Sequence, residues 1–266
     1  MNKNSETLKS DFELVLDKYK KKDYQNAEIL CYKILSIDPN HFNAITILSN
    51  IAAIGGNFKK ATELLNKAIE INPNDLNTIH NLGTAYKELG NLEKASSYYE
   101  KILKINPNHT NANYNLGLVF YKRNDLKSAK NYLKKTVNIQ SNYALAFFSL
   151  ANVHIELKEF DDAVSCYQKA IELNPNLVSA HNNLGLTFRE LNDFKNAISC
   201  YKQTIKLQPN HAGAHHNLAL AYKELGQFDE YESDVDSALR SKSKGTLLLI
   251  DKLKYFKEKF VELVRS

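Results

Sequence analysis

The chain has 266 residues, 43% of them hydrophobic and 24% charged, which is ordinary for a soluble globular protein. Its net charge of +5 rests on 31 Lys and only 4 Arg. Because Arg makes most bidentate contacts with phosphate and guanine, we expect no nucleic-acid partner. No window approaches about 18 consecutive apolar residues, so no membrane span is expected. The start of the chain lacks an uninterrupted apolar run, which argues against a secretory signal and favours a cytoplasmic location.

A spacing of 34 residues runs through the whole chain. All five prolines lie on one such lattice, and series of asparagines, leucines and alanines follow the same period. The prolines are Pro39, Pro73, Pro107, Pro175 and Pro209, and the alanines are Ala27, Ala61, Ala95, Ala129, Ala163 and Ala197. A fixed period in this range is typical of a solenoid, in which each repeat buries its apolar face against its neighbours.

In chain order, we expect a polar segment over residues 1–7, seven repeats over residues 8–245 and a last helix over residues 246–266. The repeats cover residues 8–41, 42–75, 76–109, 110–143, 144–177, 178–211 and 212–245, of which the first and last are degenerate. The third repeat contains two helical patterns. Ile79, Leu82 and Tyr86 form the apolar stripe of the first pattern, which ends at Gly90, and Pro107 ends the second.

The turn between the two helices of a repeat has its own pattern. Its first site carries Gly or Asn in five of seven repeats, and these residues accept the left-handed conformation of a helix C-terminal cap. Lys22 and Lys158 occupy this site in the other two repeats, so those turns should be strained. We expect small residues of the first helices to let the recurring alanine of the second helix approach closely: Gly83, Gly117, Ala151, Gly185 and Ala219. The next turn site predicts N-caps for the second helices: Asn57, Asn91, Asp125 and Asp193.

Residues 246–266 predict an amphipathic helix. Leu249, Leu253, Phe256 and Phe260 lie on one apolar stripe, and charged residues cover the other side. Because a terminal repeat exposes an apolar face, we interpret this helix as a cap of the solenoid. The alternatives are a linker into a further domain and a docking helix for a membrane surface or a partner, self-association included.

The recurring pattern of Leu-Gly, an aromatic, Ala, an aromatic and Pro resembles the tetratricopeptide repeat (TPR), a helix–turn–helix unit of 34 residues. The resemblance covers Leu8 to Leu239. It implies an all-α fold in which helix pairs stack into a right-handed superhelix, an α-solenoid, whose first helices line a concave groove. The first repeat departs from the pattern at Val15 and Lys18, and the seventh departs from it at Tyr231.

The groove positions that the resemblance implies carry a series of asparagines. The sixth position of the first helices reads Asn81, Asn115, Ser149, Asn183 and Asn217. This series looks like the asparagine ladder of O-GlcNAc transferase superhelices, which grips extended peptide backbone. An amide side chain both donates and accepts, so it can match a peptide unit without reading its side chain. The alternative is that these asparagines only bond to neighbouring helices.

Other groove positions indicate the chemistry of the partner. Tyr114, Tyr121 and Phe148 predict an apolar patch in the middle of the groove, unless they only pack against adjacent helices. An apolar patch flanked by cations favours a peptide with a hydrophobic anchor and acidic flanks. The fifth position is never Lys, which argues against the carboxylate clamp of TPR co-chaperones. The cations lie at the twelfth position: Lys87, Arg189 and Lys223.

The sequence contains no recognisable catalytic motif. It has no Gly-rich phosphate loop, no GxSxG and no HExxH, so we expect no enzyme activity, no cofactor and no metal site. His211 and His215 have the spacing of metal ligands but no obvious third ligand, and His154 stands where other repeats have an aromatic residue. Three unclustered cysteines predict free thiols. We therefore expect a non-catalytic scaffold that binds a protein or extended peptide; the alternative is the substrate-recruiting arm of a larger enzyme, such as a glycosyltransferase, sulfotransferase or hydroxylase.

Overall fold

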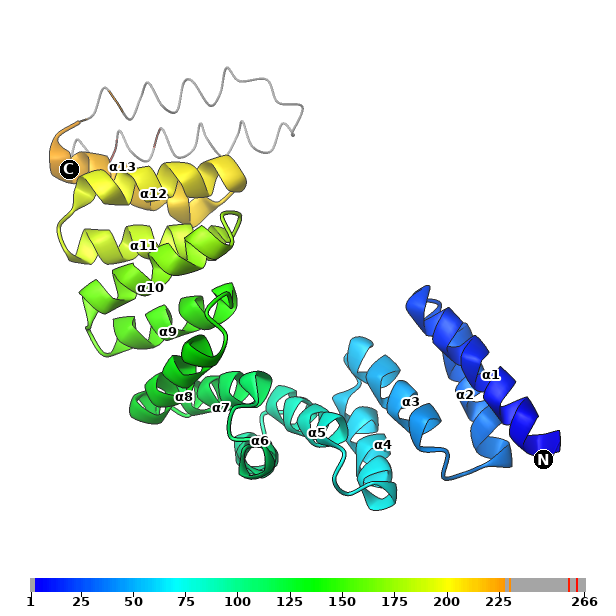
Figure 1. Ribbon diagram of the computed structural model, residues 1–266. Helices are drawn as coiled ribbons and strands as arrows, with labels where there is room; N and C mark the ends of the chain where they lie inside the picture. The colour runs from blue at the N-terminus through cyan, green and yellow to red at the C-terminus, as the bar shows by residue number, and fades with distance from the viewer. Residues whose placement is uncertain (1–2, 228–229, 231–257, 259–261, 263–266) are drawn as a thin grey trace. The chain divides into compact units, whose positions relative to one another are not determined.

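The computed structural model describes residues 3–227 and the single positions 230, 258 and 262 (Figure 1). Thirteen helices and no strand are found in this part of the chain. None of these helices is long and apolar enough to cross a membrane. The predicted helix over residues 246–266 and the second helix of the seventh repeat lie outside the described residues, apart from those single positions.

First and second helices of the repeats alternate along the chain. The first helices are α1 (Lys3–Lys20), α3 (Phe42–Ile54), α5 (Leu76–Glu88), α7 (Thr110–Lys122), α9 (Ala144–Glu156), α11 (Val178–Glu190) and α13 (Ala212–Leu225). The second helices are α2 (Tyr24–Ile37), α4 (Phe58–Ile71), α6 (Leu92–Ile105), α8 (Leu126–Ile139), α10 (Phe160–Leu173) and α12 (Phe194–Leu207). The all-α class predicted from the 34-residue period is confirmed over these residues.

The chain divides into two compact units, Met1–Tyr132 and Leu133–Ser266, with the boundary inside α8. In the first unit, α6 packs against α5 of its own repeat and against α7 of the next. In the second unit, α10 packs in the same way against α9 and α11. A second helix therefore shares its apolar residues with two first helices, as when Tyr99 of α6 lies in one cluster with Ile79 of α5 and Leu116 of α7. Each unit is a stack of helix pairs.

The alanine that recurs every 34 residues is buried in six consecutive repeats. Ala27, Ala61, Ala95, Ala129, Ala163 and Ala197 are each 0% exposed. This result confirms the register that the sequence predicts, because a shift of one residue along a helix would turn the position by about 100° toward another side.

The small residue of the first helix faces a tyrosine ring of the second helix. A Cβ atom added to Gly83 would lie 2.7 Å from Cε1 of Tyr99, and one added to Gly185 would lie 2.6 Å from Cε1 of Tyr201. Both tyrosines are fully buried. These glycines therefore make room for an aromatic ring of the second helix. The close approach of the recurring alanine stays a prediction.

The buried tyrosine hydroxyls differ in their partners. The hydroxyl of Tyr99 shares a hydrogen bond of 3.0 Å with Oγ1 of Thr84. The hydroxyl of Tyr201 has no hydrogen-bond partner among the described residues. Leu186 occupies the helix position that corresponds to Thr84, and a leucine side chain offers no acceptor. The second unit thus buries an unpaired hydroxyl at the place where the first unit has a paired one.

The turns confirm the predicted left-handed residues. φ is 74° at Gly56, 77° at Gly90 and 67° at Gly226. The lysines Lys22 and Lys158 also adopt positive φ, 60° and 59°, as the pattern predicts for strained turns. Positive φ is also found, at 60°, at the two asparagines of this site: Asn124 and Asn192.

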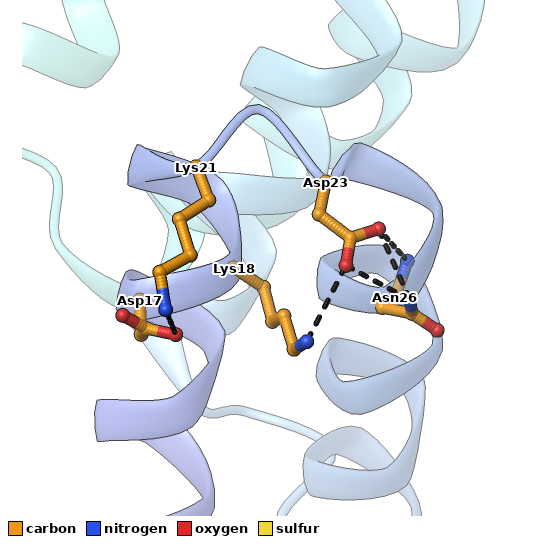
Figure 2. Close-up of polar contacts among 5 residues, drawn as sticks. All are labelled: Asp17, Lys18, Lys21, Asp23 and Asn26. Atoms are coloured by element: carbon orange, nitrogen blue, oxygen red, sulfur yellow. Dashed lines mark hydrogen bonds and ion pairs between the residues drawn. The ribbon is translucent and has the colours of Figure 1, made fainter.

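Capping side chains begin the second helices as predicted. Asn57, Asn91, Asp125 and Asp193 each accept a hydrogen bond from the backbone N–H three residues further on. Figure 2 shows the corresponding turn of the first repeat, where Asp23 caps α2 and also receives two bonds from the side-chain amide of Asn26. These bonds from Asn26 are the main reason that the pKa of Asp23 is lowered.

Lys18 reaches the same carboxylate across this turn. Its Nζ lies 3.4 Å from Oδ2 of Asp23, while Lys21 pairs with Asp17 at 2.9 Å (Figure 2). Lys18 occupies a site that carries Tyr or Phe in four other repeats. The ion pair gives this lysine a role at a position where the repeat pattern predicts packing.

Candidate functional site

The first helices of consecutive repeats meet along their polar sides. Helix α5 contacts α7 in the first unit, and α11 contacts α13 in the second. We call the side chains at the fifth, sixth, ninth and twelfth repeat positions of these helices the first-helix face. It includes Asn50, His80, Asn81, Lys87, Tyr114, Asn115 and Tyr121 in the first unit, and Phe148, Asn152, Asn182, Asn183, Arg189, Asn217 and Lys223 in the second.

Two of the predicted ladder asparagines bond to an asparagine of the preceding repeat. Asn81 Nδ2 donates to Oδ1 of Asn50 at 3.1 Å, and Asn183 Nδ2 donates to Oδ1 of Asn152 at 3.2 Å. Oδ1 of Asn152 also accepts a 2.5 Å hydrogen bond from the buried hydroxyl of Tyr167. These amides therefore connect consecutive first helices, and one of them connects the face to the core.

The other two ladder asparagines bond to a cation of the preceding repeat. Asn115 Oδ1 accepts from Nζ of Lys87 at 3.0 Å, and Asn217 Oδ1 accepts from Nη1 of Arg189 at 3.0 Å. The Lys87 side chain is only 12% exposed, and that of Arg189 is 30% exposed. Lys223, the third predicted cation, is half-buried in the last turn of α13. The asparagines thus hold Lys87 and Arg189 at the boundary between two helices.

The surroundings of Lys87 shift the protonation equilibria of this face. Burial lowers the pKa of the Lys87 ammonium, and the Glu88 carboxylate at 3.5 Å opposes that effect only in part. Burial also lowers the pKa of His80. Asn115 Nδ2 lies 3.2 Å from Nε2 of His80, and because an amide nitrogen can only donate, the imidazole nitrogen accepts. His80 is therefore a neutral acceptor that helps to orient Asn115.

The three aromatic residues predicted as one patch belong to different units. Tyr114 and Tyr121 are half-buried residues of α7 in the first unit, whereas Phe148 lies on α9 in the second. The ring of Phe148 packs against that of Tyr167, with centroids 5.9 Å apart. This contact is the packing that the sequence left open as an alternative. The grouping of the three rings stays a prediction.

Sequence reasoning missed the role of three histidines. Nδ1 of His41, His109 and His211 accepts a hydrogen bond from the backbone N–H three residues on, at 3.2, 3.1 and 3.0 Å. These histidines are the N-caps of α3, α7 and α13. Asp75 caps α5 from the same repeat position, and its place in the series was the signal that could have revealed the role.

His215 has a different structural role from His211. Nε2 of His215 lies 2.9 Å from the carbonyl oxygen of Pro209, to which it donates. His181 and Asn113 donate to the carbonyls of Pro175 and Pro107 from the same repeat position. Burial lowers the pKa of His215 and favours its neutral form.

His154, Glu159 and Asp162 form the one group of possible metal ligands among the described residues. His154 is buried, and its Nδ1 lies 2.6 Å from Oε2 of Glu159 and 3.8 Å from Oδ2 of the exposed Asp162. Glu159 supplies the polar partner of this buried imidazole. The geometry is that of a buried imidazole paired with a carboxylate, with ligand atoms within 4.8 Å of one another.

The cysteines are free thiols, as predicted. Burial raises the pKa of Cys31 and Cys200 to about 12 and that of Cys166 to about 11. The thiolate is the nucleophile, so these raised pKa values make the thiols unreactive near neutral pH.

Models of known families match most of the described chain. Residues 74–142 match a model described as tetratricopeptide repeat, residues 151–189 and 185–226 match one described as TPR repeat, and residues 212–244 match a further tetratricopeptide repeat model. Residues 20–102 match the model of anaphase-promoting complex, cyclosome, subunit 3. The chain has no significant match among curated proteins.

Solved structures share the fold. MamA is 25% identical, with 68% of this chain and 97% of MamA covered and a TM-score of 0.56. YrrB, described as a TPR protein with an unusual peptide-binding site, is 22% identical over 70% of this chain and 96% of its own, with a TM-score of 0.57. PilF of Pseudomonas aeruginosa is 20% identical over 85% and 99%, with a TM-score of 0.68.

Stacked helix pairs with a 34-residue period and a polar first-helix face define a helical repeat protein of the solenoid class. The matching family models identify the kind of helical repeat. The chain is a tetratricopeptide repeat protein.

Proposed function

We propose that this protein is a non-catalytic scaffold that binds an extended segment of another protein on its first-helix face. One observation carries the proposal: in each unit, amide and cationic side chains occupy the boundary between consecutive first helices. Apolar side chains at this boundary would pack the helices without the free-energy cost of desolvating polar groups, so the polar side chains favour a binding role. The likeness in fold to YrrB, described as having a peptide-binding site, supports the proposal. A cytoplasmic location remains a prediction.

In this proposal, Asn81 and Asn183 exchange their bonds between helices for bonds to peptide backbone. Asn115 and Asn217 keep the bonds of their Oδ1 atoms to Lys87 and Arg189 and offer their amide nitrogens to the peptide. Neighbouring helices pack about 8–10 Å apart, and an extended chain advances ~3.3 Å per residue. Consecutive asparagines would therefore meet about every third residue of the ligand. Because an amide matches both N–H and C=O groups, this grip tolerates many sequences, as in the asparagine ladder that the series resembles.

Specificity would come from the other residues of the face. Tyr114, Tyr121 and Phe148 are the proposed sites for a hydrophobic anchor, since buried aromatic contacts contribute much of the binding free energy at protein interfaces. An Ala substitution of Phe148 should then discriminate among ligands, whereas loss of the asparagines should weaken different ligands alike.

The test uses peptides selected on the full-length chain from a displayed library, with affinities measured by calorimetry. Replacing the four ladder asparagines by Ala should weaken every selected peptide, by roughly tenfold for each ~1.4 kcal/mol of lost hydrogen bonding. Asn138→Ala is the matched control, because Asn138 is an exposed asparagine of the second helix α8. Equal affinity of the peptides for the wild-type chain and the fourfold variant, with loss in the Asn138 variant, would place the binding surface on the second helices.

A further inference from the structure

The polar contacts of the first-helix face recur at a longer period than the repeat itself. In the first unit, an Asn–Asn bond joins α3 to α5 and a cation–Asn bond joins α5 to α7. In the second unit, the same two kinds of bond join α9 to α11 and α11 to α13 in the same order. Corresponding residues are 102 apart, or three repeats: Asn50 and Asn152, Asn81 and Asn183, Lys87 and Arg189, Glu88 and Glu190, Asn115 and Asn217.

The helical stack does not itself require a cation at this position. The twelfth repeat position carries Tyr19, Ala53, Tyr121 and Ile155 in the first helices that lack the cation. Lys87 loses hydration there, as its exposure of 12% and its lowered pKa show. Since burying a charge opposes folding, the recurrence of a cation at this position, in Lys87, Arg189 and Lys223, points to a use outside the fold. Of these, Lys87 and Arg189 bond to an asparagine of the next repeat.

The surroundings of each cation indicate the ligand. Among the described residues, Nζ of Lys87 has two polar neighbours, Asn115 Oδ1 at 3.0 Å and Glu88 Oε1 at 3.5 Å, although an ammonium has three donors. Arg189 donates to Asn217 and lies 3.7 Å from Glu190, although a guanidinium has five donors. One cation beside one glutamate suits a singly charged anion better than a phosphate, which carries nearly two charges.

We propose that each unit carries one site for a carboxylate side chain of the bound segment, formed by Lys87 and Asn115 in the first unit and by Arg189 and Asn217 in the second. The protein then binds two acidic residues of its partner, one in each unit, through equivalent contacts. This inference rests on the proposed function, because it names the chemistry of the partner: a segment rich in aspartate or glutamate. The asparagine positions the cation in both sites, and the carboxylate takes the donors that remain.

The experiment uses the full-length chain labelled with nitrogen-15 and a small probe, N-acetyl-aspartate N-methylamide. The neutral control is N-acetyl-asparagine N-methylamide, which has nearly the same shape and no charge. The side-chain amide signals of Asn115 and Asn217 report on the two sites separately. Both signals should move saturably with the charged probe, and neither should move with the neutral one.

Variants assign the response to the proposed residues. Lys87→Met should remove the response of Asn115 and leave that of Asn217, and Arg189→Met should do the reverse. Both should fold, because apolar side chains occupy this position in other repeats. Lys87→Arg should keep the response. Lys206→Met, which removes an exposed cation of the second helix α12, is the matched control and should change neither signal.

The outcomes separate this inference from the proposed function. Absence of a saturable response, a response at one site only, or equal loss in the Lys206 variant overturns the two-site inference. In that case, the affinities of the library-selected peptides for the wild-type chain and for the fourfold asparagine variant would still test the asparagine ladder. If instead the probe binds at both sites while the fourfold asparagine variant keeps its affinity for peptides, the proposed mode of peptide binding fails and the carboxylate sites stand.

Discussion

Gly83→Ala tests whether the first helix is shaped to receive a tyrosine of the second helix. The added Cβ would lie 2.7, 2.9 and 3.0 Å from three ring atoms of Tyr99, closer than carbon atoms normally approach. Tyr99 is 0% exposed, and its hydroxyl is bonded to Thr84, so the ring has little room to move. We expect a steric cost of about 1–3 kcal/mol from overpacking. Alanine is favoured over glycine in a helix by ~1 kcal/mol, so the net loss of stability should be about 0–2 kcal/mol.

The same substitution in a Tyr99→Leu background isolates the steric effect. Leu133 is the natural residue at the corresponding position of α8, so a leucine there is compatible with the repeat. Without the ring, Gly83→Ala should retain only its helix-forming advantage and stabilise the protein by ~1 kcal/mol. The effect of the substitution should therefore change sign between the two backgrounds, with a coupling free energy of about 1–3 kcal/mol.

Denaturant unfolding followed by circular dichroism measures the stability of the wild-type chain, the two single variants and the double variant. The second unit contains a natural comparison, since Ala151 occupies the glycine position next to Tyr167. The hydroxyl of Tyr167 bonds to Asn152 at 2.5 Å, so a different hydroxyl partner accompanies the extra methyl group. Adding Thr84→Asn to Gly83→Ala should accordingly recover part of the loss. An effect of Gly83→Ala that is equal in the wild-type and Tyr99→Leu backgrounds would refute the steric reasoning.

Three further predictions address single features of the turns and the core. Lys158→Gly should stabilise the protein by ~0.5–1 kcal/mol, because glycine adopts the positive φ of 59° without strain and its flexibility offsets only part of that gain. The denaturant midpoint of the variant measures the change in stability, and a midpoint below that of the wild-type chain contradicts the prediction. Tyr201→Phe should be neutral or stabilising, whereas Tyr99→Phe should cost ~1 kcal/mol, because only the Tyr99 hydroxyl has a partner; equal losses in the two variants exclude this reasoning. The pKa of His215 is lowered in the folded state, so the contribution of this residue to stability is present above about pH 6.5 and is lost as the pH falls below that value. His215→Asn introduces the residue type that Asn113 supplies at the same repeat position. This variant should keep its stability at about pH 8 and show a smaller pH dependence of unfolding between about pH 5 and 8.

Local features of the fold could be predicted from the sequence because they depend on residues within one turn of each other. The left-handed backbone at Gly90 and Lys158 follows from the turn position alone. The capping bonds of Asn91 and Asp193 join side chains to backbone groups three residues away. The burial of Ala163 follows from its place in the helical period. The same reasoning applied to Asp75 would have identified the histidine caps.

Contacts between helices could not be predicted in this way. Gly83 and Tyr99 are 16 residues apart, and the sequence did not show which side chain of α6 would face the glycine. Lys87 and Asn115 are 28 residues apart and meet only because α5 and α7 lie side by side. The spacing of the asparagines predicted a row of amides, but it did not show that every one is bonded to a neighbouring first helix.

The sequence by itself determined that this chain is a series of helix pairs with a 34-residue period, since hydrophobic spacing, turn residues and caps act over short distances. Only the tertiary structure decided that Asn81 and Asn183 bond to asparagines while Asn115 and Asn217 bond to cations. The physical reason is that a side chain of the first helix finds its partner one repeat away. That partner depends on how neighbouring helices are rotated and packed, which no single repeat of the sequence contains.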